Sequence, residues 1–116
     1  MGEISAGQPM EAIENIEGYL DLINTFGPKK PLFCLRVNGD SMEGAGIVED
    51  DLVIVRKQPT AEPGQIVAAM INGEALVKRL KKIGNSFVLK PENNAYSVIK
   101  GQFEIIGKVI GVIRKF

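Results

Sequence analysis

The fold is decided by residues 65–80, which read QIVAAMINGEALVKRL. Two runs rich in apolar residues, Gln65–Ile71 and Glu74–Leu80, flank the dipeptide Asn72-Gly73. Asn-Gly is a preferred pair for a two-residue turn between strands, because both central positions of that turn need a positive φ. The stretch therefore predicts an antiparallel β-hairpin.

Further short strands are expected on both sides of this hairpin. Leu52–Val55 is an apolar run of a kind typical of a strand buried on both faces. The other predicted strands are Leu32–Val37, Ser86–Lys90, Phe103–Ile106 and Lys108–Ile113, with the last two hinged near Gly107 and a turn over residues 81–85. Short strands separated by glycine turns predict an all-β fold, a compact barrel-like or sandwich arrangement of mostly antiparallel strands.

The chain is predicted to consist of an arm followed by one compact domain. Its 116 residues suffice for one hydrophobic core but not for two. Residues 1–30 are expected to form the arm and linker, and residues 31–116 to form the β domain, with the sequence GPKKP at 27–31 marking the boundary. Within the arm, residues 10–22 fit either a short helical turn or an extended segment, and their pattern does not choose between them.

Composition excludes several classes of function. Basic and acidic residues balance at 14 each, so no net charge draws the chain to nucleic acid or to anionic membranes. No apolar run is long enough to span a bilayer. The single cysteine, Cys34, excludes an internal disulfide, fits a cytoplasmic protein and is expected to be a small core residue.

No metal and no cofactor are expected. The chain has no histidine, and the acidic group Glu43, Glu49, Asp50 and Asp51 lacks the ligand spacing of a calcium loop. This group is interpreted as a solvated turn. The basic stretch 78–82 is likewise interpreted as a solvated face rather than a phosphate-binding patch.

Ser41 is the candidate nucleophile, in the tight corner GDSM that follows an apolar run. The absence of histidine excludes a Ser-His-Asp triad, so another group must accept the serine proton. A lysine serves as such a base when burial lowers its pKa. The alternative for Ser41 is an ordinary Gly-Asp-Ser turn without chemistry.

Lys78 is the candidate base. Alternate residues of a strand share a face, so Lys78 points to the same side as Leu76 and Leu80, while Arg79 points to the other. Two leucine neighbours on that face suggest the burial that a neutral amine requires. The alternative is a lysine at a strand edge whose ammonium group reaches water.

Taken in order, these motifs resemble the C-terminal domain of the LexA repressor family. The matching segments are VNGDSM at 37–42, GI at 46–47, DLVIV at 51–55, EALVKRL at 74–80, PEN at 91–93 and GVIR at 111–114. The resemblance runs from Ile4 to the end of the chain. It implies a self-cleaving serine peptidase domain in which Ser41 is the nucleophile and Lys78 the general base.

The resemblance also implies the substrate bond and the groups that stabilise the reaction. The family's scissile bond joins alanine or cysteine to glycine ahead of this domain, and Ala6-Gly7 matches it. The small side chains of Ala6 and Gly7 suit close approach to a nucleophile. The family further implies an oxyanion site made by backbone amides, here assigned to Asp40 and Ser41.

Partners are implied in the same way. Family members form homodimers and respond to DNA damage when a RecA filament on single-stranded DNA stimulates their cleavage. This chain lacks the family's helix-turn-helix domain, so we expect no direct DNA binding by it. Only six residues precede Gly7, which favours the C-terminal part of a longer repressor.

Three alternatives to the repressor interpretation remain. A UmuD-like accessory protein of an error-prone polymerase shares this domain and a short arm, and the stretch 94–97 is similar to that branch. If the chain is a non-catalytic dimerisation module, substitutions of Ser41 and of Lys78 are expected to have no effect, and the arm is expected to stay intact. A signal-peptidase-like enzyme that acts on other chains also uses serine and lysine, but the lack of a membrane segment disfavours it.

Overall fold

The computed structural model describes residues 3–5 and 31–114. The strands are β1 (Glu3–Ser5), β2 (Leu32–Asn38), β3 (Leu52–Lys57), β4 (Ile66–Ile71), β5 (Glu74–Ile83), β6 (Ser86–Lys90) and β7 (Glu104–Ile113). A 3-10 turn, η2 (Glu43–Ala45), interrupts the connection from β2 to β3. The predicted all-β fold is confirmed, while the two alternatives for residues 10–22 lie outside the described residues.

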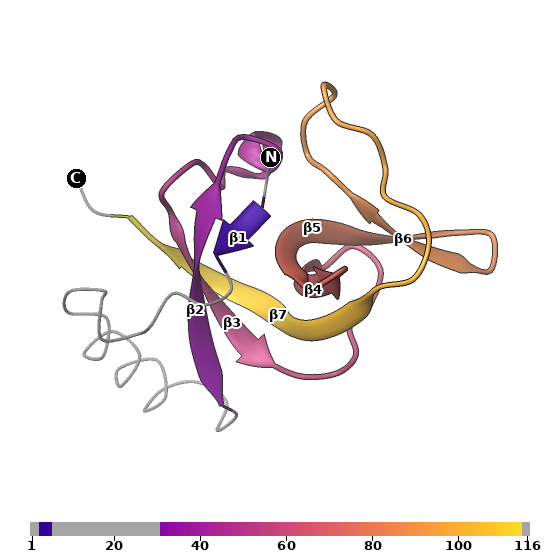
Figure 1. Ribbon diagram of the computed structural model, residues 1–116, viewed down its shortest axis with the longest axis horizontal. Coiled ribbons are helices and arrows are strands. Elements are labelled where there is room, and N and C mark those ends of the chain that lie inside the picture. Colours follow the sequence, from indigo (N-terminus) through magenta and orange to yellow (C-terminus); the bar gives the residue numbers. More distant parts are fainter. Residues whose placement is uncertain (1–2, 6–30, 115–116) are drawn as a thin grey trace.

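All of these strands belong to one antiparallel sheet that curls back on itself. Their order is β1-β2-β3-β7-β4-β5-β6, and β1 pairs additionally with β5. Glu3 is therefore opposite Asn38 on one side and Leu76 on the other. Figure 1 shows β1 lying between β2 and the strongly curved β5, so that this short strand completes a barrel-like closure.

The predicted hairpin forms as expected and extends further than expected. Ile71 pairs with Glu74 across the turn, where Asn72 and Gly73 both have positive φ. However, β5 continues to Ile83, because residues 81–83 pair with residues 86–88 of β6. The predicted turn over residues 81–85 is thus wrong, and the chain reverses only at residues 84–85.

The prediction of two closing strands hinged near Gly107 is also wrong. β7 passes through Gly107 without a break, but its register shifts against both neighbours: Ile110 is an extra residue opposite β3, and Ile106 is one opposite β4. A Cβ atom on Gly107 would lie 2.3 Å from Val55 Cγ1 and 2.6 Å from the carbonyl oxygen of Arg56. The glycine therefore permits close approach of β3 within one continuous strand.

The hydrophobic core connects the segments that carry the candidate residues. One cluster contains Met42, which follows Ser41, and Val77, which precedes Lys78, packed with Val37 and Val53. Each of these four side chains is at most 1 % exposed.

Cys34 packs in a second cluster, where burial raises the pKa of its thiol to about 11, so the prediction of an inert core cysteine is confirmed.

Candidate functional site

Lys78 lies in the middle of β5 with its side chain inside the protein. It pairs with Val67 of β4, and residues 76 and 69 form the next pair on the same face. The side chain is only 2 % exposed. The alternative of a lysine that reaches water is therefore wrong, because sheet register directs this side chain inward.

Ser41 lies in the connection between β2 and η2 and is also completely buried. Lys78 Nζ is 3.0 Å from Ser41 Oγ, and it also donates a hydrogen bond of 3.2 Å to the carbonyl oxygen of Val77. The structure thus brings together two polar side chains that are 37 residues apart in the sequence. A serine hydroxyl and a lysine amine at this distance are within reach of direct proton transfer.

The segment that carries Ser41, residues 39–51, leaves the sheet and returns to it. We call this segment the nucleophile loop. Its two ends are joined where Val37 N donates to Asp51 O and Asp50 N donates to Val37 O, both at 2.8 Å. Gly39 and Gly46 have φ of 86° and 80°, which allows the tight turns on either side of Ser41. Backbone contacts at its base therefore fix where the loop starts and ends.

Asp40, assigned with Ser41 to the backbone oxyanion site, is held by a loop from the other end of the chain. Its carbonyl oxygen accepts hydrogen bonds from Glu43 N at 3.1 Å and from Asn93 Nδ2 at 3.0 Å. Its carboxylate accepts a 2.5 Å hydrogen bond from the hydroxyl of Tyr96, and this bond raises the pKa of Tyr96. Sequence reasoning did not find Asn93 or Tyr96 as contacts of Asp40, since neither lies in a periodic pattern.

Asp51 overturns part of the prediction of a solvated acidic turn. Its side chain is 1 % exposed and accepts two 2.7 Å hydrogen bonds from Arg114, which also donates to Gly46 O. Val48 N donates to the same carboxylate at 2.8 Å. The hydrogen bond with Arg114 is the main reason that the pKa of Asp51 is lowered. The other three members of the group, Glu43, Glu49 and Asp50, are exposed as predicted.

The basic stretch 78–82 is not one solvated face. Lys78 is buried, and Arg79 pairs with the carboxylate of Glu92. Lys82 is exposed, with its Nζ 5.6 Å from the centre of the Phe87 ring. Among the residues that the structure describes, no group of three or more His, Cys, Asp or Glu side chains is arranged to hold a metal ion.

The predicted cleavage site, Ala6 and Gly7, lies outside the described residues, but the strand just before it does not. β1 pairs with β2, which leads to Ser41, and with β5, which contains Lys78. Its Glu3 is opposite Asn38, three residues before Ser41, whereas Ser5 is opposite Arg36. β1 therefore runs away from the serine–lysine contact.

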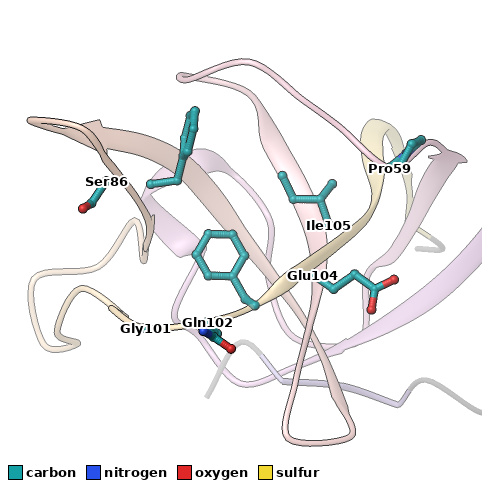
Figure 2. Close-up of a pocket in the computed structure, with 8 residues that line it drawn as sticks. Pro59, Ser86, Gly101, Gln102, Glu104 and Ile105 are labelled. Carbon is teal, nitrogen blue, oxygen red and sulfur yellow. The ribbon is translucent and has the colours of Figure 1, made fainter.

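A separate hollow of about 620 Å³ lies between β6 and the start of β7. Figure 2 shows Ser86 at one side of it and Pro59 at the other, with Gln102 and Ile105 between them. Neither Ser41 nor Lys78 lines this hollow. Its walls bring no serine and lysine together, so it lies apart from the candidate site.

Fold and site together define a β domain built around a buried serine–lysine pair. The model of the Peptidase S24-like family matches residues 1–110, and the chain belongs to this family.

Similar proteins are named LexA repressors. The chain is 45% identical over 116 residues to the one from Caldicellulosiruptor saccharolyticus, covering 99% of the chain and 57% of that relative. It is 43% identical to the one from Corynebacterium diphtheriae, with 99% and 49% covered, and 44% identical to the one from Acetivibrio thermocellus, with 99% and 55% covered. The chain thus spans about half the length of the curated relatives it matches.

In the part of the chain that the structure describes, no helix has the length and apolar character to cross a membrane.

Proposed function

We propose that this chain is the self-cleaving serine peptidase domain of a LexA-like repressor of the SOS response, acting in the cytoplasm. It cuts its own Ala6-Gly7 bond, with Ser41 as nucleophile and Lys78 as general base. Residues 1–30 are the arm that carries the bond, and residues 31–116 are the peptidase domain. The observation that carries the proposal is the 3.0 Å contact between the two buried side chains.

In the proposed reaction, the neutral amine of Lys78 takes the proton of Ser41 Oγ while Oγ attacks the carbonyl carbon of Ala6. The backbone amides of Asp40 and Ser41 stabilise the resulting oxyanion. The ammonium group of Lys78 then returns the proton to the amine of Gly7 as the peptide bond breaks, which leaves an acyl ester on Ser41. Water hydrolyses this ester with the same lysine as base, releasing residues 1–6 and regenerating the serine.

Burial supports the role given to the lysine. A low-dielectric environment disfavours the charged form of an amine, and only the neutral amine accepts a proton. The side chain of Lys78 is 2 % exposed. Cleavage is therefore expected to accelerate as the pH rises.

The direction of β1 supports a regulated reaction. A bond can be cut only when its carbonyl carbon comes within about 3–3.5 Å of the attacking oxygen. β1 leads away from Ser41, and Ser41 is fully buried in this state. Cleavage therefore requires a state in which the carbonyl carbon of Ala6 reaches Ser41 Oγ. A partner that favours the cleavable state would then switch the reaction on.

The partners proposed here follow from the similarity to LexA repressors. We propose that the domain forms a homodimer and that a RecA filament on single-stranded DNA acts as co-protease. The names of the relatives support a repressor over a UmuD-like accessory protein. Operator DNA would be bound by a separate domain of the longer protein, not by residues 1–116.

The test is the intact mass of the purified chain after incubation at pH 7 and at pH 10, with and without activated RecA filament. Loss of residues 1–6, faster at pH 10, is expected for the wild type. Replacing either member of the pair, as Ser41→Ala or Lys78→Ala, should slow cleavage at least about 10³-fold, as for other members of catalytic dyads and triads.

Matched controls keep this test specific. Ser86→Ala and Lys100→Ala remove an exposed serine and an exposed lysine and should cleave like the wild type. Continued cutting at Ala6-Gly7 in pure Ser41→Ala protein contradicts the assignment of the nucleophile. An intact wild-type chain under all four conditions contradicts self-cleavage itself and favours a non-catalytic dimerisation module.

A further inference from the structure

The segment that follows β6, residues 91–96 with the sequence PENNAY, contacts the nucleophile loop at three places. Glu92 O accepts a 2.8 Å hydrogen bond from Gly44 N. Asn93 Nδ2 donates to Asp40 O at 3.0 Å, and the Tyr96 hydroxyl donates to the Asp40 carboxylate at 2.5 Å. Two of these contacts hold the residue immediately before Ser41.

The same segment is also attached to the strand that carries Lys78. The guanidinium of Arg79, the next residue after Lys78, donates its Nε hydrogen to the carboxylate of Glu92. This hydrogen bond is the main reason that the pKa of Glu92 is lowered. Lys90 Nζ lies 3.6 Å from the other oxygen of that carboxylate. Glu92 is thus bound to β5 through its side chain and to the nucleophile loop through its backbone.

The segment is itself ordered by internal hydrogen bonds. Asn93 Oδ1 accepts a 2.9 Å hydrogen bond from Ala95 N, and Asn93 O accepts one of 3.1 Å from Tyr96 N. These bonds close a turn that places the amide of Asn93 and the hydroxyl of Tyr96 on the same residue, Asp40. Because the turn is closed by these bonds, the side chains of Asn93 and Tyr96 are held in a fixed arrangement against Asp40.

We propose that residues 91–96 are a brace that sets the distance between Ser41 and Lys78, with Glu92, Asn93 and Tyr96 as positioning residues. The proposal rests on the proposed self-cleavage, whose rate the brace would control.

The need for such a brace follows from how the two reacting groups are held. Lys78 is fixed by sheet register, whereas Ser41 lies on a loop that has no strand partner of its own. A misplacement of about 1 Å between reacting groups is enough to cost up to roughly 100-fold in rate. The brace connects Asp40, the residue before Ser41, with Arg79, the residue after Lys78. A connection between these two residues directly constrains the distance between Ser41 and Lys78.

The test is the pH–rate profile of self-cleavage in the double variant Asn93→Ala/Tyr96→Phe, from pH 7 to pH 10. We expect the limiting rate at high pH to fall about 10-fold or more, because the defect is in geometry. Tyr96→Phe alone removes one hydroxyl from an exposed side chain and should give an intermediate loss. Melting temperatures are measured in parallel to separate the rate effect from a change in stability.

The matched control is Asn94→Ala/Ser97→Ala, which changes two exposed polar residues of the same loop that make none of the contacts described above. It should cleave within about twofold of the wild type, since surface substitutions away from such contacts have small effects. If the wild type cleaves and the Asn93→Ala/Tyr96→Phe variant keeps its full limiting rate, the brace is overturned and the proposed function stands. If the wild type does not cleave at any pH or with RecA filament, the proposed function is overturned and the brace with it.

Discussion

Lys78 and Ser41 reach the same point from two different kinds of backbone. Lys78 extends from β5, where pairing with β4 fixes the positions of residues 74–79. Ser41 extends from the nucleophile loop, which is fixed by single contacts with distant segments such as Asn93 and Arg114. The comparison teaches that the proposed base is placed by a repeating pattern and the proposed nucleophile by individual contacts. The two regions should therefore respond differently to substitution.

The largest change in stability is expected on the sheet side of this comparison, for Gly107→Ala. The new methyl group would clash with Val55 and with the backbone of Arg56 in β3, and neither the branched side chain nor the paired backbone can easily move. We expect a loss of about 2–3 kcal/mol in the free energy of unfolding, typical of an overpacked core. Urea unfolding in a Ser41→Ala background measures it without interference from cleavage.

Gly111→Ala is the control for this prediction. It lies on the same strand, but its added Cβ would meet only Ile54 Cδ1, at the ordinary contact distance of 3.6 Å. Its free energy of unfolding should stay within about 0.5 kcal/mol of the parent. If Gly107→Ala and Gly111→Ala lower the free energy of unfolding equally, the close approach of β3 at Gly107 does not contribute to the stability of the sheet.

A smaller and pH-dependent change is expected at the far end of the nucleophile loop, for Asp51→Asn. At pH 7 the variant should lose about 1–2 kcal/mol, because a buried hydrogen-bonded carboxylate no longer faces Arg114. The pKa of Asp51 is lowered in the folded state, so its contribution is present above the ordinary value of 3.8 and is lost as the pH falls through the lowered value. The difference between the two proteins should shrink on going from pH 7 to pH 2 in urea unfolding experiments.

Asp50→Asn provides the comparison at the neighbouring position. Asp50 is exposed, and asparagine tolerates its positive φ of 70° at least as well as aspartate does. Its unfolding free energy should follow that of the wild type at both pH values. An Asp51→Asn deficit that does not change with pH would exclude ionisation of Asp51 as the source of the stability.

The smallest change in stability is expected where the nucleophile loop meets the brace, for Gly44→Ala. The new Cβ would lie 2.5 Å from Glu92 O, so the two loops must move apart. Both are near the surface, and we expect less than about 1 kcal/mol of destabilisation. Cleavage at pH 10 should nevertheless slow about tenfold, because the shift displaces the loop that carries Ser41.

The two glycine variants should therefore differ in what they change. Gly44→Ala should lower the cleavage rate more than the stability, whereas Gly107→Ala should lower the stability. Glu43→Ala, at an exposed position in the same 3-10 turn, is the control for the rate effect. A Gly44→Ala chain that cleaves like the Glu43→Ala chain would show that the approach of the two loops does not govern the position of the nucleophile.

Sequence reasoning succeeded where a local pattern decides the structure. The Asn72-Gly73 turn, the strand around Lys78 and the burial of Cys34 all follow from alternation or from turn chemistry within a few residues. It was wrong about Gly107, because a glycine that breaks a strand and one that admits a neighbouring strand look the same in a sequence.

The reading of Asp51 failed for a related reason. Its partner Arg114 is 63 residues away, so nothing near Asp51 in the sequence distinguishes a buried ion pair from a solvated turn. The same holds for the contacts of Asn93 and Tyr96 with Asp40, at separations of 53 and 56 residues.

The sequence by itself determined the all-β class and the central hairpin, since these depend on residue types and on a period of two along strands. It suggested Ser41 and Lys78 for the chemistry through their residue types and through the resemblance to the LexA family. The tertiary structure alone decided that Lys78 Nζ and Ser41 Oγ lie 3.0 Å apart and that Asp51 is buried. It also decided that residues 91–96 connect the two sides of the site. Each of these depends on where segments far apart in the chain meet when the sheet curls and closes, and that is set by the packing of the whole core rather than by any local preference.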